Sequence, residues 1–206
     1  MGSLNLNPNE KETSHEKTER PHFECTKCGA CCRDESLLVT VTGSDIVRIT
    51  SALGLSSNEI LKAIDFYILS DGITTPIGLE QIPSVETERG SAYIALKKMD
   101  NGDCIFLKDD LCMIHPVRPV VCKSFPFTFN DSDKEWSWGL SAKREICPGL
   151  GTGPLITEND IRELAKTILP EMRIYKEFTD EWNTSQTSPT AAKLLKAIID
   201  DLRFYS

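Results

Sequence analysis

Residues 25–32 read Cys-Thr-Lys-Cys-Gly-Ala-Cys-Cys, and no other stretch of the chain holds cysteines so densely. Two-residue spacers let a loop bend so that successive thiolates converge on one centre, and Gly29 can adopt the positive φ that such a bend often needs. Three cysteines at this spacing are similar to the loop that feeds a cubic iron–sulfur cluster. Cys25-x-x-Cys28-Gly29 alone would equally suit a zinc knuckle. The spacing therefore predicts a metal site and leaves the metal open.

Cys31 and Cys32 are adjacent. Neighbouring side chains usually diverge, so two adjacent cysteines rarely bind one metal ion. We expect one of them to serve a different metal ion, or a different iron of a larger cluster. The alternative is that one of the two is structural.

Four further cysteines follow in turn-rich segments, which brings the total to eight, and none lies after position 147. The first 21 residues are polar and have no apolar core, so they do not form a secretory signal. Cytosolic thiols are kept reduced, and clustered cysteines there indicate metal or redox chemistry rather than disulfides. Eight ligands suffice for two tetrathiolate centres, or for one centre with spare cysteines. The candidate metal ligands are Cys25, Cys28, Cys31, Cys32, Cys104, Cys112, Cys122 and Cys147.

A thiolate-ligated centre keeps net negative charge, which cations and backbone N–H groups must offset. Arg118 and Lys123 flank Cys122 and are candidates for that role around a bound cofactor, although both also suit ordinary surface positions. The nearby phenylalanines would exclude water and tune a redox potential, or else simply form core. His115 could act as a ligand or a proton carrier, but a packed histidine is the favoured interpretation, as it is for His22.

The bulk composition narrows the class of protein. The chain is 40% hydrophobic, its net charge is −8 and its pI is near 5.0. It can therefore build a core without disulfides, and no basic stripe supports nucleic-acid binding. No apolar run is long enough to cross a bilayer. We expect a soluble, cytoplasmic protein without membrane insertion.

The predicted fold class is α+β: a small, loop-rich cysteine-cluster domain with short strands and helices, followed by C-terminal helices. The predicted division is a disordered tail over residues 1–21, a metal-binding domain over 22–153 and a helical extension over 154–206 that packs on it. Strands are expected at 37–42, 92–98, 104–107 and 111–115, and loops at 71–90 and 147–154. Three prolines in 116–129 argue against a helix there.

Helix signals are clearer than strand signals. One helix is expected from Asp45 to Leu53, capped by Ser44 and stopped by Gly54. A second is expected to start after Ser56, where Glu59 completes a capping box, and to run to position 69. The C-terminal helices are expected at 158–169, 171–182 and 190–204, with Pro170 separating the first two.

Taken in order, the cysteines and the Arg118-Pro119, Phe125-Pro126-Phe127 and Cys147-Pro148-Gly149 segments resemble the YkgJ-type cysteine-cluster family, a zinc- or iron-chelating domain with a CxxCxxCC signature. The resemblance covers about residues 22–153 and implies that all eight cysteines are ligands. Members are often labelled iron–sulfur proteins or oxidoreductases. Lys123 departs from the arginine common at that position, so charge is kept but bidentate pairing is lost. A related domain occurs in a flagellin lysine methylase, but no nucleotide loop supports that activity here.

Two functions follow as hypotheses. The first is a redox protein whose iron–sulfur cluster, with 4Fe-4S favoured, passes electrons to or from a partner protein; if the chain is an enzyme, it would be an iron–sulfur oxidoreductase. The alternative is a structural or regulatory zinc module without catalysis. An iron chaperone or sensor would require labile binding. A metal-dependent hydrolase ranks last, because catalytic zinc sites recruit His or carboxylate ligands and the chain has three His.

Overall fold

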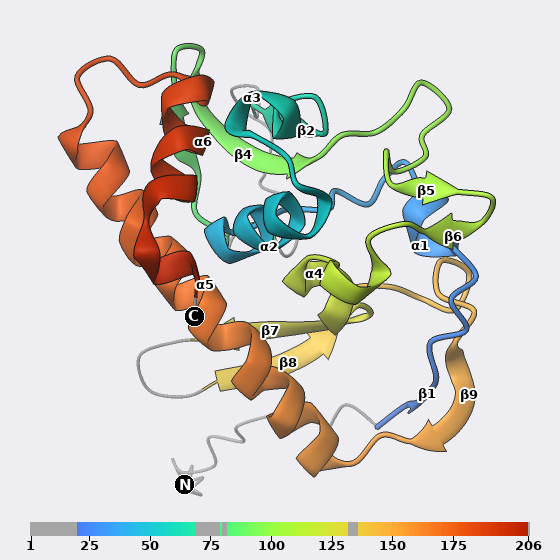
Figure 1. Cartoon of the computed structure of the whole chain (residues 1–206). Coiled ribbons are helices and arrows are strands. Elements are labelled where there is room, and N and C mark those ends of the chain that lie inside the picture. Colours follow the sequence, from blue (N-terminus) through green and yellow to red (C-terminus); the bar gives the residue numbers. More distant parts are fainter. Residues whose placement is uncertain (1–19, 69–78, 80–81, 132–135, 206) are drawn as a thin grey trace, which may run out of the picture.

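The structure is a computed structural model that describes residues 20–68, 79, 82–131 and 136–205 (Figure 1). Helices and strands are interspersed up to position 155, and a long helix and a shorter one follow. The fold class is α+β, as predicted. The elements of the first half are β1 (His22–Phe23), α1 (Ala30–Arg33), α2 (Gly43–Leu53), α3 (Ser57–Ile60), β2 (Ile64–Tyr67), β3 (Val85–Thr87), β4 (Gly90–Leu96), β5 (Leu107–Lys108) and β6 (Leu111–Cys112). Those of the second half are η2 (His115–Val117), α4 (Val120–Ser124), β7 (Phe127–Asp131), β8 (Trp136–Leu140), β9 (Leu150–Leu155), α5 (Glu158–Ser185), α6 (Ala191–Asp200) and η3 (Leu202–Tyr205).

Among the described residues the strands form small antiparallel sheets. One has three strands in the order β2-β4-β3, and three have two strands each: β1 with β9, β5 with β6, and β7 with β8. The pair β1 and β9 joins the start of the cysteine-rich region to its end. The two ends are therefore held together beside the bottom of α5 (Figure 1).

Helix α2 begins earlier than predicted, and its cap is Thr42 rather than Ser44. The Thr42 side chain accepts from the Asp45 N–H, while the Asp45 carboxylate accepts from the Thr42 N–H at 2.9 Å. Both residues are buried, so this capping box lies inside the protein. Gly54 ends the helix with φ +64°, as the sequence predicted.

The capping box of Ser56 and Glu59 is present, but the helix that it starts ends at Ile60. The prediction of a helix to position 69 is wrong over 64–67, where β2 pairs with β4 in register Ile64↔Leu96. Cross-strand burial outweighs the helical periodicity here. The predicted strand at 37–42 is reduced to a single bridge, Thr40↔Ala95, beside β4.

Two segments expected to be irregular contain regular structure. Within 116–129 the prolines bracket the short helix α4 instead of interrupting it: Pro119 is its N-cap, and Pro126 lies after its last residue. Residues 150–155 form β9 rather than a loop. Of the expected strand 104–107 only Leu107 is in a strand, and 111–115 shortens to β6. Half of the loop expected at 71–90 lies outside the described residues, and its later part contains β3.

Helix α5 continues through Pro170, so the two predicted helices are one helix of 28 residues. The residues on either side of Pro170 pack inward, with Leu169 and Tyr175 buried. We infer that this packing outweighs the hydrogen bond that proline removes. The third predicted helix ends earlier, as α6 followed by η3. Across the described parts of the chain, no helix combines the length and the apolar character needed to cross a membrane.

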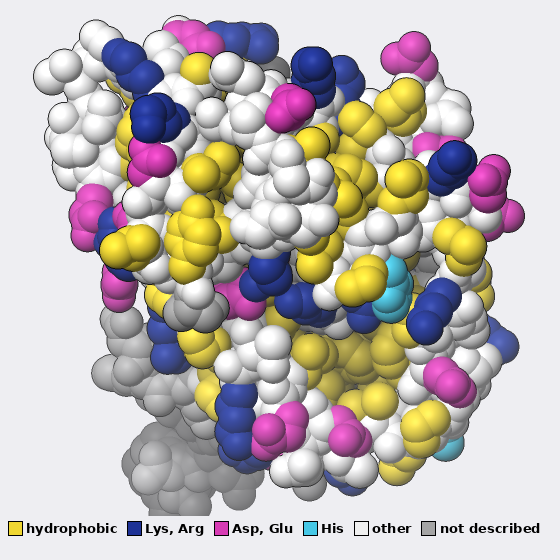
Figure 2. Space-filling model, in the orientation of Figure 1, with side chains coloured by type: hydrophobic (Ala, Val, Ile, Leu, Met, Phe, Trp, Pro, Cys, Tyr) yellow, Lys and Arg dark blue, Asp and Glu magenta, His cyan; other side chains and the backbone are white. Residues whose placement is uncertain are grey.

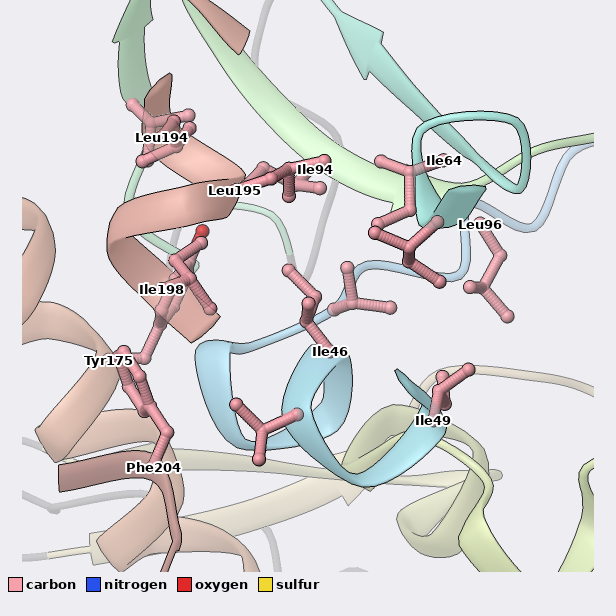
Figure 3. Packing of buried hydrophobic residues seen from close by; sticks show 14 of the residues in the cluster. Ile46, Ile49, Ile64, Ile94, Leu96, Tyr175, Leu194, Leu195, Ile198 and Phe204 are labelled. Atoms are coloured by element: carbon pink, nitrogen blue, oxygen red, sulfur yellow. The ribbon is translucent and has the colours of Figure 1, made fainter. Parts of the chain in front are cut away.

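Two hydrophobic clusters share α5. The larger one packs α2, β2, β4 and α6 together, and Figure 3 shows Ile46, Ile94, Leu195 and Ile198 facing one another from these elements. The smaller one packs the first half of α5 against β7 and α4, and it includes Ile168. The second half of α5 joins the larger cluster through Tyr175, Phe178 and Trp182, so one helix covers both clusters.

At Gly43 the 3-10 helix η3 packs closely against α2. A Cβ at this position would lie 2.3 Å from Cζ of Phe204, whose ring is buried. We therefore expect Gly43→Ala to destabilise the protein by about 1–3 kcal/mol, because the ring has to move out of a packed site. Urea unfolding followed by circular dichroism measures this. Gly139→Ala is the control, because its Cβ would meet its nearest neighbour at 3.5 Å; equal losses in both variants would contradict the prediction.

Candidate metal centre

The loop at 25–32 is bent by two residues with positive φ, Lys27 at 54° and Gly29 at 70°. A Cβ on Gly29 would lie 3.0 Å from the backbone oxygen of Asp110, so glycine is needed both for its conformation and for its small size. The loop leads into α1, which carries Cys31 and Cys32. Arg33 donates from Nη1 to the carbonyl of Cys28 at 3.0 Å and so fixes the loop against the helix.

Helix α1 is joined to a segment about 70 positions later in the chain. The N–H of Cys104 donates to the carbonyl of Cys32 at 2.8 Å. Lys98 donates from Nζ to the carbonyls of Cys32 at 3.2 Å and Asp34 at 2.8 Å. These bonds place Cys104 beside the first cysteine group. Lys98 could not be identified from the sequence alone, because its role depends on contacts with distant carbonyls that no local pattern shows.

The remaining cysteines of this region come from two further elements. Cys112 lies on β6, in a hairpin whose turn residues Asp109 and Asp110 have positive φ. Cys122 lies in the middle of α4. Together with α1 and the segment before β5, these elements surround a cavity of about 470 Å³. Five of the eight predicted ligands line it: Cys31, Cys32, Cys104, Cys112 and Cys122.

The thiols at one end of the cavity are in hydrogen-bonding contact. Cys32 lies between Cys31 and Cys112, and its hydrogen bonds to their sulfur atoms strongly raise its own pKa. The same bonds are the main cause that lowers the pKa of Cys31 to about 7 and that of Cys112 to about 6, and Arg118 lowers both further. Cys112 and Cys31 therefore lose their protons at lower pH than an ordinary cysteine, while Cys32 between them stays a thiol.

Cys31 is the common neighbour of the other cysteines. Its charge raises the pKa of Cys104, Cys122 and Cys147, although burial is the larger cause in each of the three. It also acts on Cys28, whose pKa is nevertheless lowered, mainly by a hydrogen bond from Thr26. The early and late cysteine groups are therefore neighbours in space.

Three predicted ligands lie outside the cavity. Cys25 and Cys28 are exposed on the bent loop, and Cys147 is buried where β9 begins. The charges of Cys31 and Cys25 both act on Cys147. Cys25 follows β1 and Cys147 precedes β9, so these two thiols lie at the side where β1 and β9 pair. That each of the eight cysteines is a ligand stays a prediction.

Arg118 lines the cavity, and it donates from Nη1 to Nε2 of His115 at 3.0 Å. Burial, Arg118 and Lys27 all lower the pKa of His115. A neutral His115 thus accepts from Arg118 and holds the guanidinium toward the thiols. Lys123 lies on α4 next to Cys122 and is not among the residues that line the cavity. That Arg118 and Lys123 offset the charge of a bound metal centre stays a prediction.

A buried carboxylate binds the first turn of α4. Asp45 has no exposed surface, and its Oδ1 accepts from the Val120 N–H at 3.0 Å, at the first residue of α4. Oδ1 also pairs with Arg48, which donates to both carboxylate oxygens of Glu171 on α5. Asp45 therefore connects α2, α4 and α5 next to Cys122. The pattern Thr42-Gly-Ser-Asp45 is a readable capping signal that would have identified this residue.

The chemistry of these donors fits a thiophilic metal. The five cysteines at the cavity offer sulfur ligands. Soft thiolate ligands select zinc or iron–sulfur centres over calcium or magnesium. Among the residues that the structure describes, no group of three or more His, Cys, Asp or Glu side chains is arranged to hold a metal ion. The thiols are thus gathered around the cavity but do not form a finished coordination shell. Binding would draw them closer together.

A small α+β fold that gathers thiols from two short helices, a strand and a loop around one cavity fits the class of cysteine-rich metal-chelating proteins. The chain belongs to the CxxCxxCC family, described as "Putative zinc- or iron-chelating domain", whose profile matches residues 24–148. This agrees with the predicted family, and it supports binding of zinc or iron. No curated protein and no solved structure matches the chain.

The thiol group predicts a pH dependence in reduced, metal-free protein. Iodoacetamide should alkylate Cys112 with a half-maximal rate near pH 6, because only the thiolate reacts and the pKa of this thiol is lowered to about 6. Cys104 should react only at higher pH, because burial raises its pKa. Mass spectrometry of peptides from timed reactions measures both rates. Equal rates for the two at pH 7 in folded protein would contradict the prediction, and unfolded protein is the control.

Proposed function

We propose that this chain carries an iron–sulfur cluster, with 4Fe-4S favoured, and acts in electron transfer. One observation carries the proposal: thiols from four separate segments line one cavity whose other walls are largely apolar and include Phe125, Phe127 and Phe129. Such walls exclude water and tune the potential of a thiolate-ligated cluster. A cavity of about 470 Å³ also offers more room than a single ion needs.

Within this proposal the chain's own residues have defined tasks. The cysteines would hold the cluster, which supplies one-electron redox chemistry when bound. His115 positions Arg118, and the guanidinium offsets the negative charge of Cys31 on α1. Lys98 fixes the carbonyl of Cys32 and so keeps α1 in place. If the protein is an enzyme, it is an iron–sulfur oxidoreductase.

A partner protein completes an electron-transfer role. Leu111 and Met113 flank Cys112 on either side, and they are 63% and 61% exposed. Exposed apolar side chains beside the cysteine group offer a short route to a docked redox partner. The net charge of −8 speaks against nucleic acid as that partner. A cytoplasmic location suits the eight cysteines, because reduced thiols persist there. We propose no membrane insertion.

The decisive experiment is metal and sulfide analysis of protein purified without oxygen after native expression. Brown protein that contains iron and acid-labile sulfide is the expected result. Colourless protein with stoichiometric zinc would reject the cluster.

The second candidate is a structural or regulatory zinc module without catalysis. The bent loop favours it, because the backbone N–H of Ala30 and the side chain of Thr26 both bond to Cys28, an arrangement that equally suits a zinc knuckle. This function predicts that a chelator removes the helical and the near-ultraviolet circular dichroism signals together. A fold that survives chelation would count against it.

A further inference from the structure

The cavity extends well beyond its thiol end. Its walls combine side chains of the two hydrophobic clusters, with Leu96 and Ile114 from the larger and Phe129 and Ile168 from the smaller. Protein interiors are packed with few voids larger than a water molecule. A cavity of about 470 Å³ is instead in the range of small-molecule sites. Figure 2 shows a hollow whose bottom is formed by hydrophobic side chains, and a group of Lys and Arg side chains lies close to it.

Besides the ionisable thiols of Cys31 and Cys112, on which the charge of Arg118 acts, three charged residues are among those that line the cavity: Glu35, Lys98 and Arg118. Glu35 is exposed and keeps its hydration. Lys98 donates to the backbone carbonyls of Cys32 and Asp34. Arg118 bonds to His115, and within the described part of the chain it forms no ion pair with a carboxylate. A guanidinium has five donor hydrogens, so Arg118 keeps donors for a ligand.

We propose that this cavity binds a small amphipathic carboxylate, with the carboxylate on Arg118 and the apolar body between the two clusters. The head group follows from Arg118, because a guanidinium pairs best with a planar two-oxygen anion. The body follows from the walls, which offer apolar carbon to a chain or ring. Arg118 also acts on the thiols at the other end of the cavity, so a bound carboxylate would share this guanidinium with the metal centre.

The test uses the full chain in its purified, metal-containing form, with decanoate as the probe and decanol as its neutral counterpart. Isothermal titration calorimetry should give saturable binding of one decanoate per chain. Decanol should bind about tenfold more weakly, since it lacks the charge that pairs with Arg118. The absence of saturable decanoate binding would overturn the proposal. Equal binding of decanol would overturn the role of Arg118.

Two variants locate the site. Leu38→Trp places a larger side chain at a half-buried position in the cavity wall, and it should weaken decanoate binding at least about tenfold. Leu53→Trp is the matched control, because Leu53 is 43% exposed on α2 and does not line the cavity; its affinity should stay within about twofold of the original. Unchanged affinity in Leu38→Trp would overturn the location.

Two measurements keep the test decisive if a variant folds poorly. Metal per chain is determined for every variant, so loss of ligand binding is separated from loss of the metal centre. In the unsubstituted protein, decanoate should shift the methyl NMR signals of Ile168 and Met172, which line the cavity, and leave that of Leu53 in place. Shifts confined to residues away from the cavity would overturn the proposal without any substitution.

Discussion

Replacing Asp45 by alanine is expected to lower the free energy of unfolding by about 3–5 kcal/mol, the cost of removing one member of a buried ion pair. The carboxylate is fully buried, and it accepts hydrogen bonds from Thr42 and Val120 while it pairs with Arg48. Alanine leaves those donors without a partner inside the protein. Chemical unfolding followed by circular dichroism measures the loss.

Asp160→Ala is the matched control. Asp160 forms the same capping box, with Thr157 at the start of α5, but the box is exposed to solvent. Water can replace the lost acceptor there, so we expect a much smaller effect. Comparable losses in the two variants would show that burial of the Asp45 network does not matter.

The same carboxyl group predicts how stability varies with pH. Burial raises the pKa of Asp45 to about 6, against an ordinary value of 3.8. Between these values the native state holds a proton that the unfolded chain has released, so stability from this group falls as pH rises from about 4 to 6. We expect Asp45→Ala to remove that part of the pH dependence. An unchanged pH profile of unfolding would contradict the assignment.

Replacing Cys31 by serine is expected to weaken metal binding by more than about 100-fold, since even groups that only orient a metal ligand contribute about 10- to 100-fold. Cys31 touches Cys32, and its charge acts on Cys104, Cys122 and Cys147. Its loss therefore affects the whole thiol group. Metal per chain, measured by mass spectrometry after gel filtration, checks the result.

Cys147→Ser provides the comparison for this experiment. Cys147 lies outside the cavity, in a turn that leads into β9, and we expect water to substitute for its thiol more readily. Its metal loss should therefore be smaller than that of Cys31→Ser. Full metal content in Cys31→Ser, or a larger loss in Cys147→Ser, would contradict the proposed arrangement.

Much of the local structure could be predicted from the sequence. Gly54 ends α2 and the Ser56–Glu59 capping box starts α3, because these signals act within a few residues. Predictions were wrong where distant contacts decide the outcome. Residues 64–67 form a strand because β4 is available beside them, and α5 continues through Pro170 because both of its halves have a core to cover.

For the candidate site, too, local patterns could be read from the sequence and contacts between distant segments could not. Cysteine spacing predicted a metal-binding protein, and the family match agrees. The sequence could not show which thiols meet, because the contact between Cys32 and Cys104 depends on a backbone bond across the fold. The roles of Lys98 and His115 as supports arise in the same way. The cavity itself forms between two clusters, so no single segment encodes it.

Helix α5 reaches both hydrophobic clusters, one with each half, and it begins after the last residue that the family profile covers. The hydrophobic clusters therefore extend beyond the segment that defines the family. A rigid rod that bridges two cores also sets their separation, and Ile168 and Met172, near its midpoint, line the cavity between them. The spacing around the thiols is thus governed by a part of the chain that supplies none of them.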